Sequence, residues 1–190
     1  MNIVFFGTPD FAAPALHEIN KSRHHIISTI TGPAKPSGRG QRLIKTPIFK
    51  ESEALGIPII EVDDFQNPIF LEKLNSLNAD IFIVVAFKIL PEEIFSIPKH
   101  GTVNLHASLL PKYRGSAPIH HAILNGETQT GITTFQINNR VDAGSIYLQE
   151  EYTITSEATT GMVWSDLSIA GANLLVKTLD GIENNSIFSI

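Results

Sequence analysis

Short apolar runs recur along the chain and alternate with segments of helical character. The first run, Ile3 to Phe6, is too short for a helix and ends in a Gly-Thr-Pro turn, as expected of a strand buried on both faces. Such alternation predicts an α/β fold with an open, mostly parallel sheet and helices on both faces. Further strands are expected at His25 to Thr31, Ile57 to Ile60, Ile81 to Val85 and Val103 to His106.

The later part of the chain predicts a different kind of strand pairing. Ile132 to Ile137 and Ser145 to Ile154 alternate well and are separated by a glycine-bearing loop, which predicts neighbouring antiparallel strands. The sequence therefore predicts a Rossmann-like sheet with an antiparallel edge. Asp10 is expected to cap the first helix. Helices are expected over Asp10 to Asn20, Thr46 to Leu55, Pro68 to Leu77, Ala117 to Leu124 and Gly161 to Leu179.

Length and composition fit one globular domain. The chain has 190 residues, of which 43% are hydrophobic and 17% charged. We expect a catalytic domain over residues 1–183 and the start of a linker over residues 184–190. With no apolar run of about 18 residues and no basic leader, a monomer of the cytoplasm without a membrane partner is expected. Absence of cysteine excludes disulfides, a thiolate nucleophile and cysteine-ligated metals.

Charge is unevenly distributed along this acidic chain. The net charge is −5, yet no Asp or Glu lies between Glu18 and Glu51. A basic patch that meets phosphates is one interpretation of this interval, and a solvated loop is the other. Inside this interval lie, among other cations, Lys35, Arg39, Arg42, Lys45 and Lys50.

Two common kinds of site are not expected. The turn Gly7 to Asp10 holds a single glycine and lacks the spaced glycines of a dinucleotide site. His120 and His121 are adjacent on an expected helix and face about 100° apart, which argues against a zinc site. Surface or packing roles are expected for His17, His24, His25 and His100.

Two polar residues near the end of an expected central strand are candidates for catalysis. Asn104 and His106 are two apart, so they point to one face, near the strand end where open α/β sheets bind ligands. A carboxylate at Asp142, in the loop between the antiparallel strands, can hydrogen-bond an imidazole and hold it oriented or protonated. A structural histidine and a plain turn aspartate are the alternatives.

Longer motifs carry a family resemblance. The segment Asn104-Leu-His-Ala-Ser-Leu-Leu-Pro-Lys-Tyr-Arg-Gly-Ser-Ala-Pro118 resembles the signature of the folate-dependent formyltransferases. Ile3-Val-Phe-Phe-Gly-Thr-Pro-Asp-Phe-Ala12 and Lys35-Pro-Ser-Gly-Arg-Gly40 are similar to the members that act on methionyl-tRNA. Similarity extends to Val84 to Pro91, Leu124 to Glu127 and Thr130 to Thr134.

The resemblance implies formyl transfer from 10-formyltetrahydrofolate to the amino group of methionyl initiator tRNA, without a metal. Asn104, His106 and Asp142 are the implied catalytic residues; Asn104 and a protonated His106 donate to the formyl oxygen, and Asp142 orients His106. The implied folate-binding residues are Phe87, Ile89, Leu90, Pro91, Ser108, Leu109, Leu110 and Pro111. The implied tRNA contacts are Lys35, Arg39, Arg42 and Lys45.

The chain departs from the family pattern in three ways. Ala86 to Pro91 is one residue shorter than the usual Ala-Tyr-Gly-x-Ile-Leu-Pro. Asp142-Ala-Gly-Ser145 replaces the usual Asp-Thr-Gly-Asp. Family members normally continue with a C-terminal β-barrel domain that helps hold tRNA, and this chain stops at the junction. The alternatives are a sugar-nucleotide N-formyltransferase and a non-catalytic folate-binding module.

Overall fold

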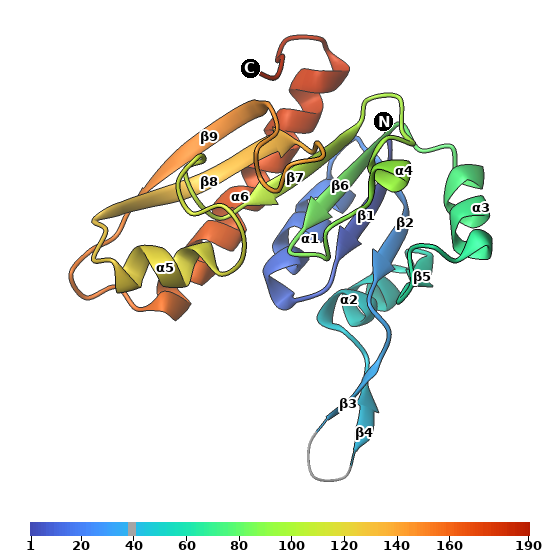
Figure 1. The fold of residues 1–190 in the computed structure, drawn as a ribbon, viewed down its shortest axis with the longest axis horizontal. Helices are drawn as coiled ribbons and strands as arrows, with labels where there is room; N and C mark the ends of the chain where they lie inside the picture. The colour runs from blue at the N-terminus through green and yellow to red at the C-terminus, as the bar shows by residue number, and fades with distance from the viewer. Residues whose placement is uncertain (38–40) are drawn as a thin grey trace.

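A 7-stranded mixed sheet organises the molecule. The computed structural model describes residues 1–37 and 41–190. The strands of the sheet are β1 (Asn2–Gly7), β2 (His25–Thr31), β5 (Ile59–Glu61), β6 (Ile81–Val85), β7 (Thr102–His106), β8 (Gln129–Gln136) and β9 (Ile146–Thr153). Their spatial order is β5-β2-β1-β6-β7-β8-β9 (Figure 1). The first five in this order are parallel, and β8 and β9 are antiparallel, so the predicted Rossmann-like sheet with an antiparallel edge is confirmed.

Helices connect the strands, and their starts are encoded locally. They are α1 (Ala13–Lys21), preceded by a 3-10 helix η1 (Asp10–Ala12), then α2 (Pro47–Leu55), α3 (Pro68–Ser76), α4 (Glu92–Phe95), α5 (Pro118–Leu124) and α6 (Thr160–Glu183). Proline lies in the first turn of α1, α2, α3 and α5, where its missing N–H costs no hydrogen bond. The side chains of Thr46 and Asn67 cap α2 and α3 by accepting from the N–H groups of Phe49 and Ile69.

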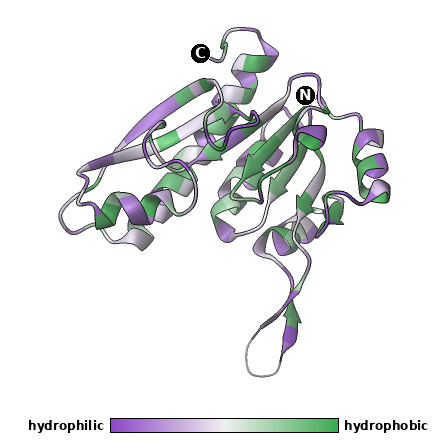
Figure 2. Cartoon of the chain, in the orientation of Figure 1, coloured by the Kyte–Doolittle hydropathy of each residue, from purple (hydrophilic) through white to green (hydrophobic). Residues whose placement is uncertain are grey.

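Alternate residues of β1 divide between two hydrophobic clusters, one on each face of the sheet. Ile3 and Phe5 belong to the cluster that includes residues of α1, α2, α5 and α6. Val4 and Phe6 belong to the cluster that includes residues of α3 and α4. All four side chains are fully buried, which stabilises the fold by about 2 kcal/mol each. Figure 2 shows hydrophobic colour concentrated in these central strands.

The sheet grows in opposite directions from β1 and β6. From β1 it extends through β2 to β5, and from β6 it extends through β7 to the antiparallel strands. Parallel α/β sheets bind ligands at the carboxyl ends of their strands beside such a reversal. The residues at the ends of β1, β6 and β7 therefore frame the expected site.

A small hairpin projects from the body of the molecule. It consists of β3 (Lys35–Ser37) and β4 (Arg42–Ile44), which pair antiparallel and extend away from the main sheet (Figure 1). Leu43 and Ile44 remain 70% and 48% exposed. The hairpin was not predicted, because its residues lack the alternation of a half-buried strand.

Other elements differ from the prediction in detail. Asp10 does not cap α1; it lies inside η1, which follows Pro9 and has no side-chain cap. The prediction also missed α4. Helix α6 ends at Glu183 rather than Leu179, because Ile182 continues its buried stripe. No helix among residues 1–37 and 41–190 has the length and apolar character needed to cross a membrane.

The last residues turn back onto the sheet. Ile190 exchanges two backbone hydrogen bonds, of 2.8 and 2.9 Å, with Ile146 at the start of β9. Residues 184–190 therefore lie against the edge of the sheet. That they begin a linker stays a prediction.

Candidate active site

A cavity of about 650 Å³ lies at the carboxyl ends of the central strands. Its walls come from the turn after β1, the segment after β6, the end of β7, residues 115–120 at the start of α5, and the loop of residues 137–142. Most of the side chains facing it are apolar, including Phe11 and Trp164, whose rings meet edge to face at 5.3 Å. An apolar cavity with a few convergent polar groups is the usual form of a small-molecule site.

His106 ends β7, and each of its ring nitrogens faces an oxygen atom. Its Nε2 lies 2.8 Å from the backbone carbonyl oxygen of Tyr113. A carbonyl only accepts hydrogen bonds, so Nε2 carries the proton and donates. The other nitrogen, Nδ1, faces Oδ2 of Asp142 at 3.6 Å. The side chains of His106 and Asp142 are 8% and 12% exposed, so the pair is shielded from water.

Asp142 is held by the two residues that follow Tyr113. Its Oδ2 accepts from the N–H of Gly115 at 2.8 Å. Its carbonyl oxygen accepts from Nε of Arg114, also at 2.8 Å. The residue adopts a left-handed conformation, with φ of 46°. Aspartate tolerates this conformation better than most residues, and the two hydrogen bonds fix its carboxylate toward His106.

Asn104 lies on the same face of β7 as His106. It is half-buried and lines the cavity, between β6 and β8, where it pairs with Val84 and Phe135. Its side-chain amide has no hydrogen-bond partner in the part of the chain that the structure describes. The amide is thus available to a ligand in the cavity. The structure brings Asn104, His106 and Asp142 to the lining of one cavity; that they are the catalytic residues stays a prediction.

The predicted folate-binding residues fall into two groups. Phe87, Ile89, Leu90 and Pro91 line the cavity on the β6 side. Ser108 to Pro111 are not among its lining residues. Instead, the Ser108 hydroxyl donates to the carbonyl of Lys112 at 2.6 Å, and the Leu110 N–H donates to the Thr133 hydroxyl at 3.2 Å. This second group supports the loop behind the cavity.

Three of the predicted tRNA contacts are described by the structure, and none of the three lines the cavity. Lys35 and Arg42 are exposed on the β3–β4 hairpin, and Lys45 follows it. The Lys45 ammonium lies 3.7 Å from the centre of the Phe49 ring and 3.5 Å from Glu53. Arg39 falls outside the described residues.

Some residues that line or support the cavity were not predicted from the sequence. Arg114 and Gly115 hold Asp142, and Tyr113 holds His106, through backbone or side-chain groups that no periodicity predicts. Their place inside the Asn104 to Pro118 motif was the available signal. Trp164, from the first turns of α6, gave none.

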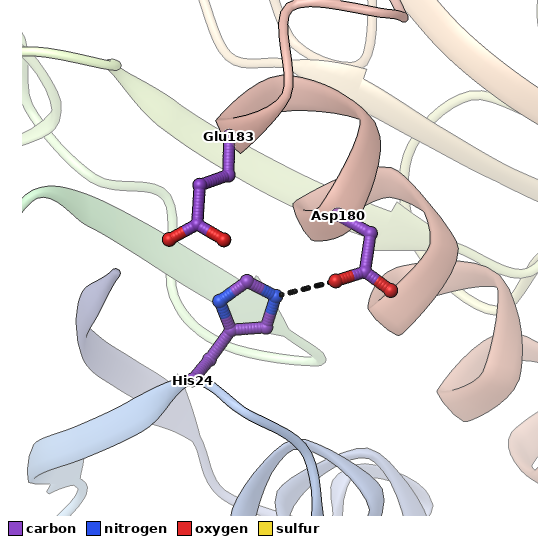
Figure 3. Close-up of side chains that lie close together, drawn as sticks. All are labelled: His24, Asp180 and Glu183. Atoms are coloured by element: carbon purple, nitrogen blue, oxygen red, sulfur yellow. Dashed lines mark ion pairs between the residues drawn. The ribbon is translucent and has the colours of Figure 1, made fainter.

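A second cluster of titratable groups consists of residues that do not line this cavity. His24 precedes β2, and Asp180 and Glu183 lie in the last turn of α6; His24 Nε2 is 3.3 Å from Asp180 Oδ1 (Figure 3). Arg23 contacts both carboxylates, at 2.8 and 2.9 Å, and the Met1 ammonium contacts Glu183 at 2.8 Å. Burial, followed by that ammonium, lowers the pKa of His24. Since cations already neutralise both carboxylates, we assign the cluster to holding α6 against the sheet.

Solved structures that resemble this fold include formyltransferases. Phosphoribosylglycinamide formyltransferase from Anaplasma phagocytophilum superposes with a TM-score of 0.81 and 23% identity, covering 97% of this chain and 88% of that one. The N-formyltransferase from Helicobacter canadensis, solved with folinic acid and dTDP-3-aminofucose, gives a TM-score of 0.74 and 22% identity, covering 99% and 66%. At these identities the likeness concerns the fold.

Sequence comparison reaches closer relatives. The chain is 47% identical over 181 residues to methionyl-tRNA formyltransferase of Moorella thermoacetica, covering 95% of this chain. It spans 58% of the length of that protein. A sequence profile described as formyl transferase matches residues 1–179, and the chain therefore belongs to the formyl transferase family.

Proposed function

We propose that the protein transfers the formyl group of 10-formyltetrahydrofolate to the amino group of methionyl initiator tRNA. The observation that carries this proposal is the cavity in which Asn104, His106 and Asp142 meet. The relatives at 40 to 47% identity that are named methionyl-tRNA formyltransferase support the choice of acceptor. Such a protein works in the cytoplasm, and we propose that it does so as a monomer.

The three polar residues divide the chemistry between them. The amine nitrogen attacks the formyl carbon, a new C–N bond forms, and the bond from that carbon to N10 of the folate breaks. Negative charge on the formyl oxygen in the transition state is stabilised by the Asn104 amide and by Nδ1–H of protonated His106. Donors placed in a shielded cavity stabilise such charge strongly, because no water has to reorganise.

Asp142 and His106 also account for the protons. The amine loses one proton on forming the amide, and the departing N10 gains one. Asp142 takes the proton from the amine, directly or through water, and His106 delivers a proton to N10. The distance of 3.6 Å between Asp142 Oδ2 and His106 Nδ1 is longer than a formed hydrogen bond. A small shift of either side chain brings the two atoms within hydrogen-bond distance, and Asp142 then passes its proton to Nδ1 of His106.

The apolar side of the cavity suits a flat pterin. Phe87 and Leu90 are anchored in the cluster beneath β6, whereas Ile89 is 75% exposed at the cavity wall. Backbone groups of this irregular segment are not used by the sheet and can recognise the polar edge of the ring. Ser108 to Pro111 contribute by supporting the loop behind the wall.

The β3–β4 hairpin supports a nucleic acid as acceptor. Lys35 and Arg42 stand on a projection that carries no acidic residue, on a chain whose net charge is −5. A local positive projection attracts a phosphate backbone, which a small amino sugar does not require. We propose that residues 184–190 lead toward a C-terminal domain that adds further phosphate contacts.

A formyl-transfer assay tests the proposal. 10-Formyltetrahydrofolate is supplied with methionyl initiator tRNA, and in parallel with a dTDP-amino sugar, to the chain and to its His106→Ala variant. We expect the tRNA alone to be formylated, and the variant to be slower by about 10². Transfer to the sugar and none to the tRNA would reverse the assignment, and binding of folate without any transfer would leave a binding module.

The tRNA affinity is tested separately. The chain is compared with a fusion to the C-terminal part of the Moorella thermoacetica relative by titration with initiator tRNA. We expect the fusion to bind more tightly and with a steeper salt dependence, because it neutralises more phosphates. Equal affinity and equal salt dependence would contradict a role for those residues.

A further inference from the structure

Tyr113 occupies an unusual position beside the catalytic pair. Its backbone has φ of 56°, the left-handed region that a residue with a bulky side chain rarely adopts. Its carbonyl oxygen, presented by this conformation, is the group that accepts from His106 Nε2 at 2.8 Å. Its side chain does not line the cavity. The hydrogen bond to the histidine therefore comes from the backbone of Tyr113.

The Tyr113 side chain is fixed at its far end. Its hydroxyl donates to Glu127 Oε1 at 2.7 Å and accepts from Nδ2 of Asn125 at 3.1 Å. Lys112 Nζ lies 3.5 Å from the same carboxylate oxygen. The Tyr113 hydroxyl, followed by the Lys112 charge, lowers the pKa of Glu127, so the acceptor stays charged at neutral pH.

The anchor itself belongs to a firmly held turn. Asn125, Gly126 and Glu127 join α5 to β8, and Gly126 takes the positive φ of 67° that ends the helix. The N–H groups of Gly126 and Glu127 donate to the carbonyls of Ile123 and Ala122, both at 3.0 Å. Helix α5 in turn places Ile119 and Ala122 in the hydrophobic core. The phenol is thus tied to the body of the domain.

The loop that Tyr113 begins also holds Asp142. The next residues, Arg114 and Gly115, each donate a hydrogen bond of 2.8 Å to it. A displacement of Tyr113 would therefore move the partners of His106 and Asp142 together.

We propose that Tyr113 is a positioning residue: its phenol, held by Glu127, fixes the loop so that its carbonyl keeps His106 protonated at Nε2 with Nδ1 toward Asp142. The kinetic part of this inference rests on the proposed function. The tautomer of His106 does not, because it can be measured without any substrate.

The first test reads the tautomer directly. Nitrogen-15 chemical shifts of the imidazoles distinguish a protonated from an unprotonated ring nitrogen, and a His106→Gln variant assigns the signal among the 7 histidines. At alkaline pH we expect His106 to hold its proton at Nε2 in the native protein. Tyr113→Phe is expected to give a mixture of both tautomers.

A matched control removes a similar bond elsewhere. The Tyr152 hydroxyl donates to Asp166 Oδ2 at 2.6 Å, between β9 and α6. Tyr152→Phe loses the same kind of hydrogen bond and is expected to leave the His106 tautomer and the formyl-transfer rate unchanged. An unaltered tautomer in Tyr113→Phe, with the protein folded, overturns the proposal.

The second test separates positioning from binding. Tyr113→Phe is expected to lower kcat by about tenfold with the KM for the folate donor within about twofold, because misplacement affects the transition state more than binding. Glu127→Ala should do the same. Glu127→Gln, which keeps an acceptor for the phenol, should restore most of the rate.

The third test measures the coupling between Tyr113 and Glu127. If the phenol acts through Glu127, the Tyr113→Phe, Glu127→Ala double variant loses no more than either single variant. Additive losses contradict the proposal. If the native chain transfers no formyl group to methionyl-tRNA, the proposed function fails, while the tautomer experiment still decides the role of Tyr113.

Discussion

Oδ2 of Asp142 and Nδ1 of His106 face each other at 3.6 Å, although Asp142 lies in the loop after β8 and His106 at the end of β7. Each is also fixed from the opposite side, His106 by the carbonyl of Tyr113 and Asp142 by the N–H of Gly115. The pair is thus held in place before any substrate binds. A site prepared in this way spends little free energy on reorganisation during reaction.

His106→Ala should lower kcat for formyl transfer by about 10² or more. The substitution removes both the donor to the formyl oxygen and the proton carrier. Steady-state kinetics measure the rate, and circular dichroism checks that the fold is retained. A rate equal to that of the native protein would make His106 a structural residue.

Asp142→Asn keeps an oxygen for the Gly115 N–H but loses the negative charge. We expect kcat to fall by about 10 to 10², because Asn neither accepts the amine proton nor stabilises a protonated His106. The melting temperature should change little. A variant with native kcat would show that the carboxylate serves the loop and not the reaction.

Gly144→Ala should damage the loop that carries Asp142. A Cβ at this position would overlap the backbone carbonyl of Gln136, and backbone cannot move aside as a flexible side chain does. We expect a loss of stability of about 2 kcal/mol, measured by urea unfolding, together with a loss of activity. Gly161→Ala, where the nearest atom is Thr159 Oγ1 at 4.0 Å, is the matched control and should be close to neutral.

Arg42→Ala should weaken tRNA binding without affecting the donor. A phosphate contact from this exposed hairpin residue predicts that the slope of log affinity against log salt falls by about 1. The KM for 10-formyltetrahydrofolate should stay constant. Lys73→Ala, at another exposed cation on α3, serves as the control, and an equal effect of both substitutions would argue for non-specific charge.

Asp80→Asn should reduce stability in a pH-dependent way. The Asn2 N–H at 2.6 Å, followed by Lys99, lowers the pKa of Asp80 below its ordinary 3.8. A carboxyl whose pKa is lower in the folded state than in the unfolded state stabilises the protein at pH values above its unfolded-state pKa. This contribution is lost as the pH falls through its folded-state pKa. The variant should therefore be less stable by about 1 kcal/mol at pH 6. Urea unfolding should show the difference shrinking below about pH 4, and a constant difference would contradict the linkage.

The layout of the sheet was predictable because its signals are local. The predicted strands at His25 to Thr31 and Ile81 to Val85 match β2 and β6 at both ends. Strands buried on both faces favour runs of apolar and β-branched residues. The two-residue period of a strand also predicted that Asn104 and His106 share one face. Such patterns identify which residues share a face, and from topology they predict which strand ends meet.

The partners of the catalytic pair were not predictable from the same signals. They depend on left-handed backbone at Tyr113, Ala117 and Asp142. Tyrosine and alanine rarely adopt this conformation, so their presence in a sequence does not predict it. Proximity of Asp142 to His106 was predicted only as one of two readings, because loop paths leave no periodic trace. The β3–β4 hairpin was not predicted, since every residue of β4 is exposed and the strand has no buried face to leave an apolar pattern.

The backbone contacts around His106 and Asp142 affect how mutations act on this centre. Every residue supplies a peptide carbonyl, and every residue except proline supplies an amide N–H. The side chains at positions 113 and 115 therefore contribute no hydrogen-bonding atom of their own to His106 or Asp142. What those positions must provide is the course of the chain. Changes there should act as faults of geometry, repairable by distant substitutions that restore the loop, whereas changes at Asn104, His106 or Asp142 remove the reacting groups themselves.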